Sequence, residues 1–187
     1  MRLTPRGLLF RGRCLPAEIG RAGLSAAKHE GDGATPIGTL HILGMLYRAD
    51  RLARPAPWAR PIGPRDLWCD APADPAYNHP VRAPFSASHE RMARPDPLYG
   101  IGLIAGWSHP QARPGKGSAI FLHQRRRPGY PTAGCIALCR KDLLWLARHL
   151  RPGTGLVIPD LACFHLRANI PGSGAAPRPN RPPRDKA

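Results

Sequence analysis

A histidine and a cysteine stand at the two ends of a short polar loop, and together they could perform nucleophilic catalysis. His123 ends the apolar stretch 118–123, and Cys135 follows Gly134 and opens the next apolar run. A cysteine becomes a strong nucleophile as its thiolate, which a neighbouring imidazole can generate or stabilise. If the two apolar stretches are adjacent strands, the 124–134 loop brings imidazole and thiol side by side. The spacing also permits an ordinary hairpin, with the cysteine a small buried apolar residue.

The loop itself carries groups that acyl transfer needs. A residue without Cβ lets a substrate approach the backbone closely, so the N–H groups of Gly134 and Cys135 are expected to face a developing oxyanion. A guanidinium group can hold a carboxylate, although a solvated loop charge is the alternative. The candidates for substrate binding are Thr132, Tyr130, Arg125 and Arg127, with Arg126 beside them.

The elements that must position this loop are predicted to be mostly short strands. Glycine-bounded or alternating apolar patterns predict them near residues 8–24, 34–43, 99–107, 118–123 and 156–158. One helix is expected after the loop, because four apolar residues share one face and Pro152-Gly153 ends the pattern. These four residues are Leu143, Leu146, Ala147 and Leu150. The predicted fold class is mostly β with this single helix.

The chain is expected to form one domain, residues 1–168, because 187 residues suffice for one substantial core. Residues 169–187 are expected to be a disordered, basic, proline-rich tail. The proline-rich segment 50–97 predicts a long excursion that covers or lines something. Its candidates for a lid or pocket wall, or for a purely structural role, are Trp68, Asp70, Tyr77 and Asn78.

The composition excludes some classes of protein. The net charge of +16 comes from arginines scattered among prolines without an aromatic-interleaved motif, so we expect no nucleic-acid partner. An anionic polymer or an acidic small substrate fits the charge equally well. No apolar run reaches the length of a membrane span, and no secretory signal is visible. The five cysteines match no zinc template, so no metal site is expected, and Cys139 is interpreted as structural.

Two motifs carry a resemblance to a known family. His123 followed by Thr132-Ala133-Gly134-Cys135-Ile136 resembles the signature of the L,D-transpeptidase catalytic domain (YkuD-like) family. Upstream, the segment 33–38, with Thr35-Pro36, resembles the family's Thr-Pro-x-Gly strand entry. The resemblance extends from about residue 8 to residue 160.

The resemblance implies a mostly antiparallel β-sandwich with Cys135 as nucleophile and His123 as its base. The thiolate would attack the peptide bond between an L-centre and a D-centre in a peptidoglycan stem peptide and form a thioester. An amine of a second stem, or water, would then take the acyl group, without a metal or an organic cofactor. Peptidoglycan stem peptides are the implied partners, carbapenem-type inhibitors are candidate ligands, and the implied location is the cell envelope.

Two departures from the family motif bear on the acceptor. The histidine before Gly-Cys is Ala133 here, and the polar residue two positions after the cysteine is Ala137. We therefore expect acylation of Cys135 to be retained and acceptor choice to shift toward water. The alternatives are an L,D-carboxypeptidase that uses the same chemistry, or an inactive module that binds peptidoglycan or another polyanion.

Overall fold

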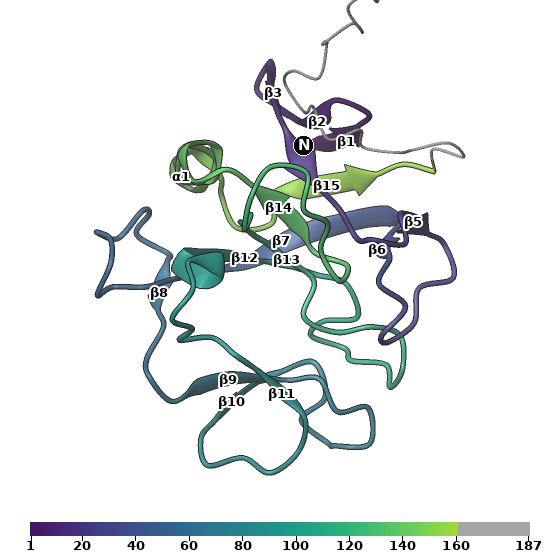
Figure 1. The fold of residues 1–187 in the computed structure, drawn as a ribbon, viewed down its shortest axis with the longest axis vertical. Helices are drawn as coiled ribbons and strands as arrows, with labels where there is room; N and C mark the ends of the chain where they lie inside the picture. Colours follow the sequence, from purple (N-terminus) through teal and green to yellow (C-terminus); the bar gives the residue numbers. More distant parts are fainter. Residues whose placement is uncertain (161–187) are drawn as a thin grey trace, which may run out of the picture.

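One large, strongly curved sheet forms the body of the protein, whose computed structural model describes residues 1–160 (Figure 1). Its strand order is β3-β2-β1-β15-β7-β12-β13-β14-β4, with β8 paired to β7. The sheet curls until its last strand, β4, contacts β2, so it is nearly closed. Its strands are β1 (Arg2–Thr4), β2 (Gly7–Phe10), β3 (Arg13–Leu15), β4 (Ala17–Glu18), β7 (Gly38–Tyr47), β8 (Arg60–Pro61), β12 (Ile101–Ala105), β13 (Phe121–Gln124), β14 (Ile136–Leu138) and β15 (Gly155–Ile158).

The longest strand, β7, forms because its apolar residues alternate with polar or small ones. Leu40, Ile42, Met45 and Tyr47 are buried, and the phase of the alternation shifts near Gly44, where the pairing with β12 is irregular. Most pairings in the sheet are antiparallel. The expected mostly β fold with one helix is thereby confirmed.

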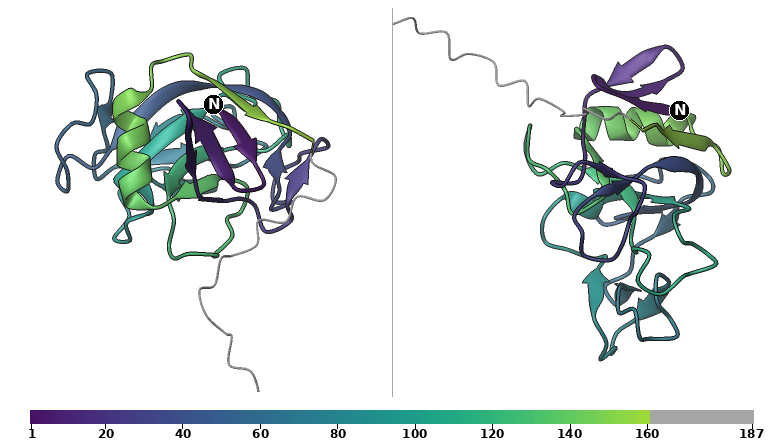
Figure 2. Two further views of the ribbon diagram at one scale, coloured as in Figure 1. Left: turned by 90° about the horizontal axis from the view of Figure 1, so that it is seen from above. Right: turned by 90° about the vertical axis from the view of Figure 1, so that its right-hand side faces the viewer.

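The predicted helix is also confirmed as α1 (Arg140–His149), which crosses one side of the curved sheet (Figure 2). Leu143, Leu146 and Ala147 are its buried residues, and they join the large core inside the sheet. Cys139 is the N-cap, because its Sγ accepts from the Asp142 N–H at 3.5 Å. This contact gives Cys139 a structural role.

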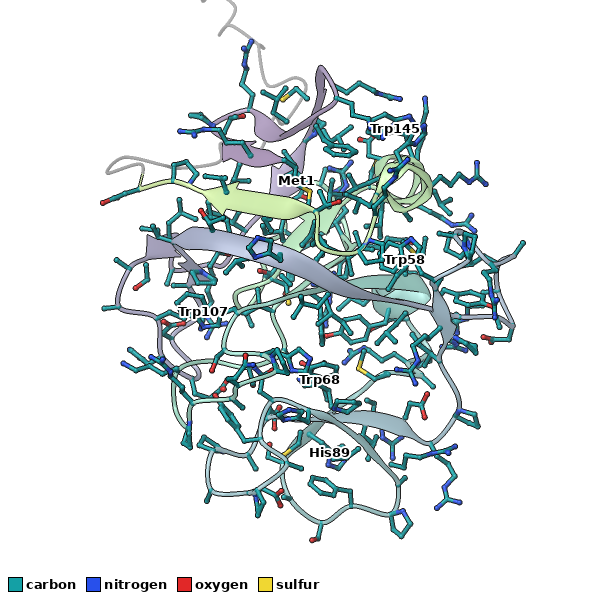
Figure 3. The ribbon with its side chains drawn as sticks, turned by 180° about the vertical axis from the view of Figure 1, so that it is seen from behind. Met1, Trp58, Trp68, His89, Trp107 and Trp145 are labelled. Carbon is teal, nitrogen blue, oxygen red and sulfur yellow. The ribbon has the colours of Figure 1, made fainter. Side chains whose placement is uncertain are left out.

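The proline-rich segment folds into a second, smaller sheet below the first. Its strands are β9 (Asp66–Cys69), β10 (Pro80–Arg82) and β11 (His89–Arg91), in the order β10-β9-β11. A second cluster of buried side chains joins this small sheet to β13, and Trp68 lies between the two sheets in Figure 3. The buried members of this second cluster are Ile62, Trp68, Met92, Tyr99 and Phe121.

Three short elements complete the fold: β5 (Leu24–Ser25), β6 (Thr35–Pro36) and the 3-10 turn η1 (Leu98–Gly100). The stretches before and after the 124–134 loop are adjacent strands, as expected. Because β13 and β14 run parallel, the alternative of an ordinary hairpin is wrong. The expected tail, residues 169–187, lies outside the described residues. Within residues 1–160, no helix is long and apolar enough to cross a membrane.

Candidate active site

The strand register places Cys135 and His123 on one face of the large sheet. Leu122 pairs with Ile136, and both lie in the large core. Because successive side chains on a strand point to opposite faces, the residues next to this pair face away from the large core. Cys135 accordingly packs against the second cluster. His123 also faces this cluster, where its ring meets the ring of Tyr99 edge-on at 5.7 Å between centroids.

The His123 imidazole is anchored by a backbone carbonyl. Its Nδ1 lies 2.9 Å from the backbone carbonyl oxygen of Gln124. A carbonyl accepts a hydrogen bond only, so Nδ1 carries the proton and Nε2 is left with its lone pair. The ring is buried, with 6% of its surface exposed, and this burial lowers the pKa of His123. The imidazole is therefore neutral at neutral pH.

The Cys135 thiol is held between two backbone groups, one at the start of β13 and one just before it. Its Sγ accepts from the Phe121 N–H at 3.3 Å and donates to the Ala119 carbonyl at 3.1 Å. Burial raises the pKa of Cys135 to about 12, which the Phe121 N–H partly opposes. Within the described part of the chain, no hydrogen bond joins this thiol to His123, so the resting pair is a neutral thiol and a neutral imidazole.

The backbone before Cys135 is fixed by two threonine hydroxyls. Thr132 Oγ1 donates to the Cys135 carbonyl at 2.6 Å and accepts from the Gly134 N–H at 3.1 Å. Thr35, which belongs to the Thr-Pro motif, donates to the Gly134 carbonyl at 2.8 Å and accepts from the Gly20 N–H at 2.9 Å. Thr132 therefore braces the loop in this structure, and the Gly134 N–H expected to face an oxyanion already has an acceptor.

Gly134 is required at its position for two reasons. Its φ of +143° is a backbone conformation that L side chains rarely adopt. A Cβ there would also lie 2.9 Å from the Ala34 carbonyl oxygen, closer than a carbon can approach without displacement. Glycine thus allows the cysteine loop to pack directly on the segment before β6.

The loop arginines have partners within the protein. Arg125 Nη1 donates to Glu18 Oε1 at 3.0 Å, and the Gly129 N–H donates to the same oxygen. Arg126 and Arg127 lie over the ring of Tyr130, with Cζ 5.8 Å and 4.9 Å from its centroid. Arg125 is therefore engaged, whereas the arginine pair and the 40% exposed Tyr130 lie at the surface.

Three candidates from the proline-rich segment are buried and form part of the site's wall. Asn78 Oδ1 accepts from Trp68 Nε1 and from the Ala119 N–H, both at 3.0 Å. Ala119 is the residue whose carbonyl accepts the thiol, and its φ is +51°. Asn78 thus supports an unusual backbone conformation next to Cys135. Tyr77, also buried, donates to Glu30 Oε2 at 2.5 Å.

Asp70 is half-buried, and its Oδ1 has no hydrogen-bond partner among the described residues.

Tyr99 and Glu90 are neighbours of the site that the sequence analysis missed. The Tyr99 hydroxyl donates to Glu90 Oε2 at 2.9 Å, and the buried ring packs against His123. Burial, with the nearby Cys135 and Glu90, raises the pKa of Tyr99. Neither residue lies in a motif, and Tyr99 showed only as the first residue of an apolar stretch. Within residues 1–160, no group of three or more His, Cys, Asp or Glu side chains could hold a metal ion.

Comparison with known proteins shows which family the chain belongs to. A solved structure of an L,D-transpeptidase from Mycobacterium smegmatis is 14% identical in sequence, with a TM-score of 0.36; the match covers 78% of this chain and 48% of that one. This chain thus spans about half the length of that structure. No curated protein matches. The sequence profile of the L,D-transpeptidase catalytic domain (YkuD) matches residues 6–158. The chain therefore belongs to the L,D-transpeptidase catalytic-domain (YkuD) family.

Proposed function

We propose that the protein is a cysteine-dependent L,D-transpeptidase that acts on peptidoglycan stem peptides through a thioester. The observation that supports this most directly is the pairing of a neutral, Nδ1-anchored imidazole with a thiol on the same sheet face. Family membership supplies the reaction class. A general base with a lone pair on Nε2 is what activation of a neutral thiol requires.

In the acylation step, the thiol turns from the Ala119 carbonyl toward His123 Nε2. The sulfur attacks the carbonyl carbon between the L-centre and the D-centre while its proton passes to the imidazole. The Cys135 N–H stabilises the oxyanion, and the Gly134 N–H can join it only if it leaves Thr132 Oγ1. His123 then returns the proton to the departing amine of the D-amino acid, which leaves the acyl group on Cys135.

The second step decides between cross-linking and hydrolysis. An amine of another stem, or water, attacks the thioester as His123 removes its proton. The bond between the acyl carbon and the sulfur then breaks, and His123 returns the proton to Cys135. Positioning an amine acceptor can supply several kcal/mol of the barrier. Ala133 is exposed and Ala137 is buried, and neither can hydrogen-bond to an acceptor through its side chain. We therefore propose an L,D-carboxypeptidase as the second candidate function, because these alanines favour water.

Product analysis with a disaccharide-tetrapeptide tests both candidates. We expect acylation of Cys135, then more tripeptide than cross-linked dimer, and Cys135→Ala should abolish both products. Dimer as the main product would refute the preference for water. Intact-protein mass spectrometry after carbapenem treatment provides a separate check on acylation. A wild-type protein that neither forms an adduct nor releases the D-amino acid would be a binding module instead.

A further inference from the structure

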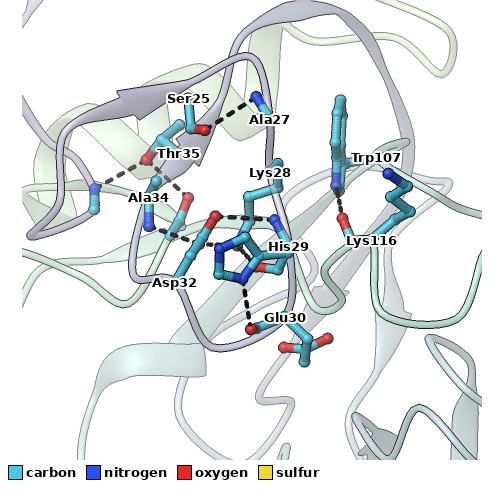
Figure 4. Close-up of polar contacts among 12 residues, drawn as sticks. Ser25, Ala27, Lys28, His29, Glu30, Asp32, Ala34, Thr35, Trp107 and Lys116 are labelled. Carbon is cyan, nitrogen blue, oxygen red and sulfur yellow. Dashed lines mark hydrogen bonds and ion pairs between the residues drawn. The ribbon is translucent and has the colours of Figure 1, made fainter.

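A hollow lies between the segment around Lys28 and the loop that connects β12 to β13. Its volume is about 410 Å³. Figure 4 shows Lys28 and Trp107, which belong to these two segments. We call this feature the Trp107 hollow. It is lined by Ala26, Ala27, Lys28, Gly106, Trp107, Ser108, His109, Gln111, Arg113 and Lys116.

Both walls of the Trp107 hollow are connected to the nucleophile. The loop that forms one wall continues to Ala119, whose carbonyl accepts the Cys135 thiol. The other wall carries Lys28, which lies against Gly117 and whose charge opposes the rise in the pKa of Cys135. The segments that line the Trp107 hollow therefore lead to the residues that hold the Cys135 thiol.

The charges in the Trp107 hollow favour an anion. No aspartate or glutamate lines it, whereas three basic side chains do. Lys28 forms an ion pair with Asp32 at 2.5 Å, and it is 4% exposed. Arg113 and Lys116 are exposed and have no ion-pair partner within residues 1–160. By contrast, Arg48, Arg94 and Arg125 all pair with carboxylates.

The backbone that carries these cations is held in place. Trp107 Nε1 donates to the Lys116 carbonyl at 2.7 Å, and the Arg113 N–H donates to Ser108 Oγ at 2.8 Å (the first is drawn in Figure 4). Asn78 Nδ2 donates to the carbonyls of Trp107 and Ser108, at 3.1 and 2.6 Å. A pre-formed hollow of a few hundred Å³ is typical in size of a small-molecule subsite, and this one combines the Trp107 ring with several polar and basic side chains.

We propose that the Trp107 hollow binds a free carboxylate of the stem peptide, held by Arg113 and Lys116, with the aliphatic part of the residue over the Trp107 ring. This inference rests on the proposed function, since it names the part of that substrate which the hollow recognises. A guanidinium binds a carboxylate through two parallel hydrogen bonds, and the lysine adds a second charge. The site thus selects stem peptides by their free carboxylates.

The test compares a stem tetrapeptide with free carboxylates to the same peptide with those carboxylates amidated. The variants are Arg113→Gln, Lys116→Gln and their double, and Arg148→Gln on α1 is the matched control. We expect kcat/KM for the free peptide to fall roughly 10- to 100-fold in the double variant, mainly through KM, as for lost hydrogen bonds to a charged group. For the amidated peptide, kcat/KM should be low with the wild type and should not fall further in the variants. Alkylation of Cys135 by neutral iodoacetamide should be unchanged.

Equal losses on both peptides, or no loss on the free one, would overturn the inference while leaving the proposed function in place. Calorimetry tests the inference even if the proposed function fails, because it measures binding without turnover. Cys135→Ala protein should bind the free peptide more tightly than the amidated one, and adding Arg113→Gln should remove the difference. If the wild type turns over neither peptide and forms no carbapenem adduct, the proposed function fails, but this binding difference still decides the inference. Equal binding of the two peptides would refute the carboxylate subsite.

Discussion

Thr35 offers a sharp test of how the cysteine loop is held in place. Its side chain is fully buried, and its hydroxyl connects the Gly20 N–H to the Gly134 carbonyl. Thr35→Val keeps the shape of the side chain but removes both hydrogen bonds. The substitution therefore leaves one buried donor and one buried acceptor without partners.

The expected loss follows from these two groups. A buried polar group left unpaired costs about 1–3 kcal/mol, so the free energy of unfolding should fall by about 2–6 kcal/mol. The effect should also reach the nucleophile, because the Gly134 carbonyl is adjacent in sequence to Cys135. We expect faster alkylation of Cys135 by iodoacetamide under native conditions, since the loop opens more often.

Urea unfolding measures the first effect, and Thr154→Val is the matched control. Thr154 Oγ1 also makes two hydrogen bonds, with the Arg151 N–H and carbonyl, but at the surface, where water can replace them. The control should lose less than about 1 kcal/mol. If the two variants lose the same free energy, the buried Thr35 bridge does not hold the loop as argued.

Two further predictions concern the nucleophile and the glycine before it. Burial favours the neutral thiol and raises the pKa of Cys135 to about 12, so iodoacetamide alkylation should keep accelerating from pH 8 to pH 10; a plateau near pH 9 would contradict this. In urea unfolding, Gly134→Ala should lower the free energy of unfolding by about 1–3 kcal/mol more than Gly153→Ala does. The reason is that the new Cβ at Gly134 would lie within 3 Å of a backbone oxygen, whereas at Gly153 it would meet nothing within 4 Å. Similar losses for the two glycine variants would show that the cysteine loop shifts away from Ala34.

Local patterns in the sequence were sufficient for the elements that carry the pair. The apolar stripe of α1 and the alternation along β7 depend on residues a few positions apart. The helix was found as predicted, whereas the strand predicted over 34–43 starts at Gly38 and continues to Tyr47. The loop between His123 and Cys135 was also recognised by its own composition. These signals are local because helix and strand periodicity arise within a single segment.

The contacts that shape the site were not predictable in the same way. Asn78 lies 41 residues before Ala119, and Glu18 lies 107 residues before Arg125. The sequence predicted that β13 and β14 would be adjacent but did not reveal that they run parallel. Each of these contacts depends on which strands become neighbours, and no short-range pattern encodes that choice.

Desolvation keeps both His123 and Cys135 neutral at rest, and this affects when the proton moves during the proposed reaction. Burial raises the pKa of the thiol and lowers that of the imidazole, so both shifts oppose a preformed thiolate–imidazolium pair. In the proposed acylation, the proton must therefore move as the sulfur attacks, when the Cys135 N–H stabilises the developing oxyanion. An electrophile that forms such an oxyanion gains this help, and a simple alkylating agent does not. The site should consequently acylate far faster than it alkylates, and its thiol stays protected until a substrate carbonyl is in place.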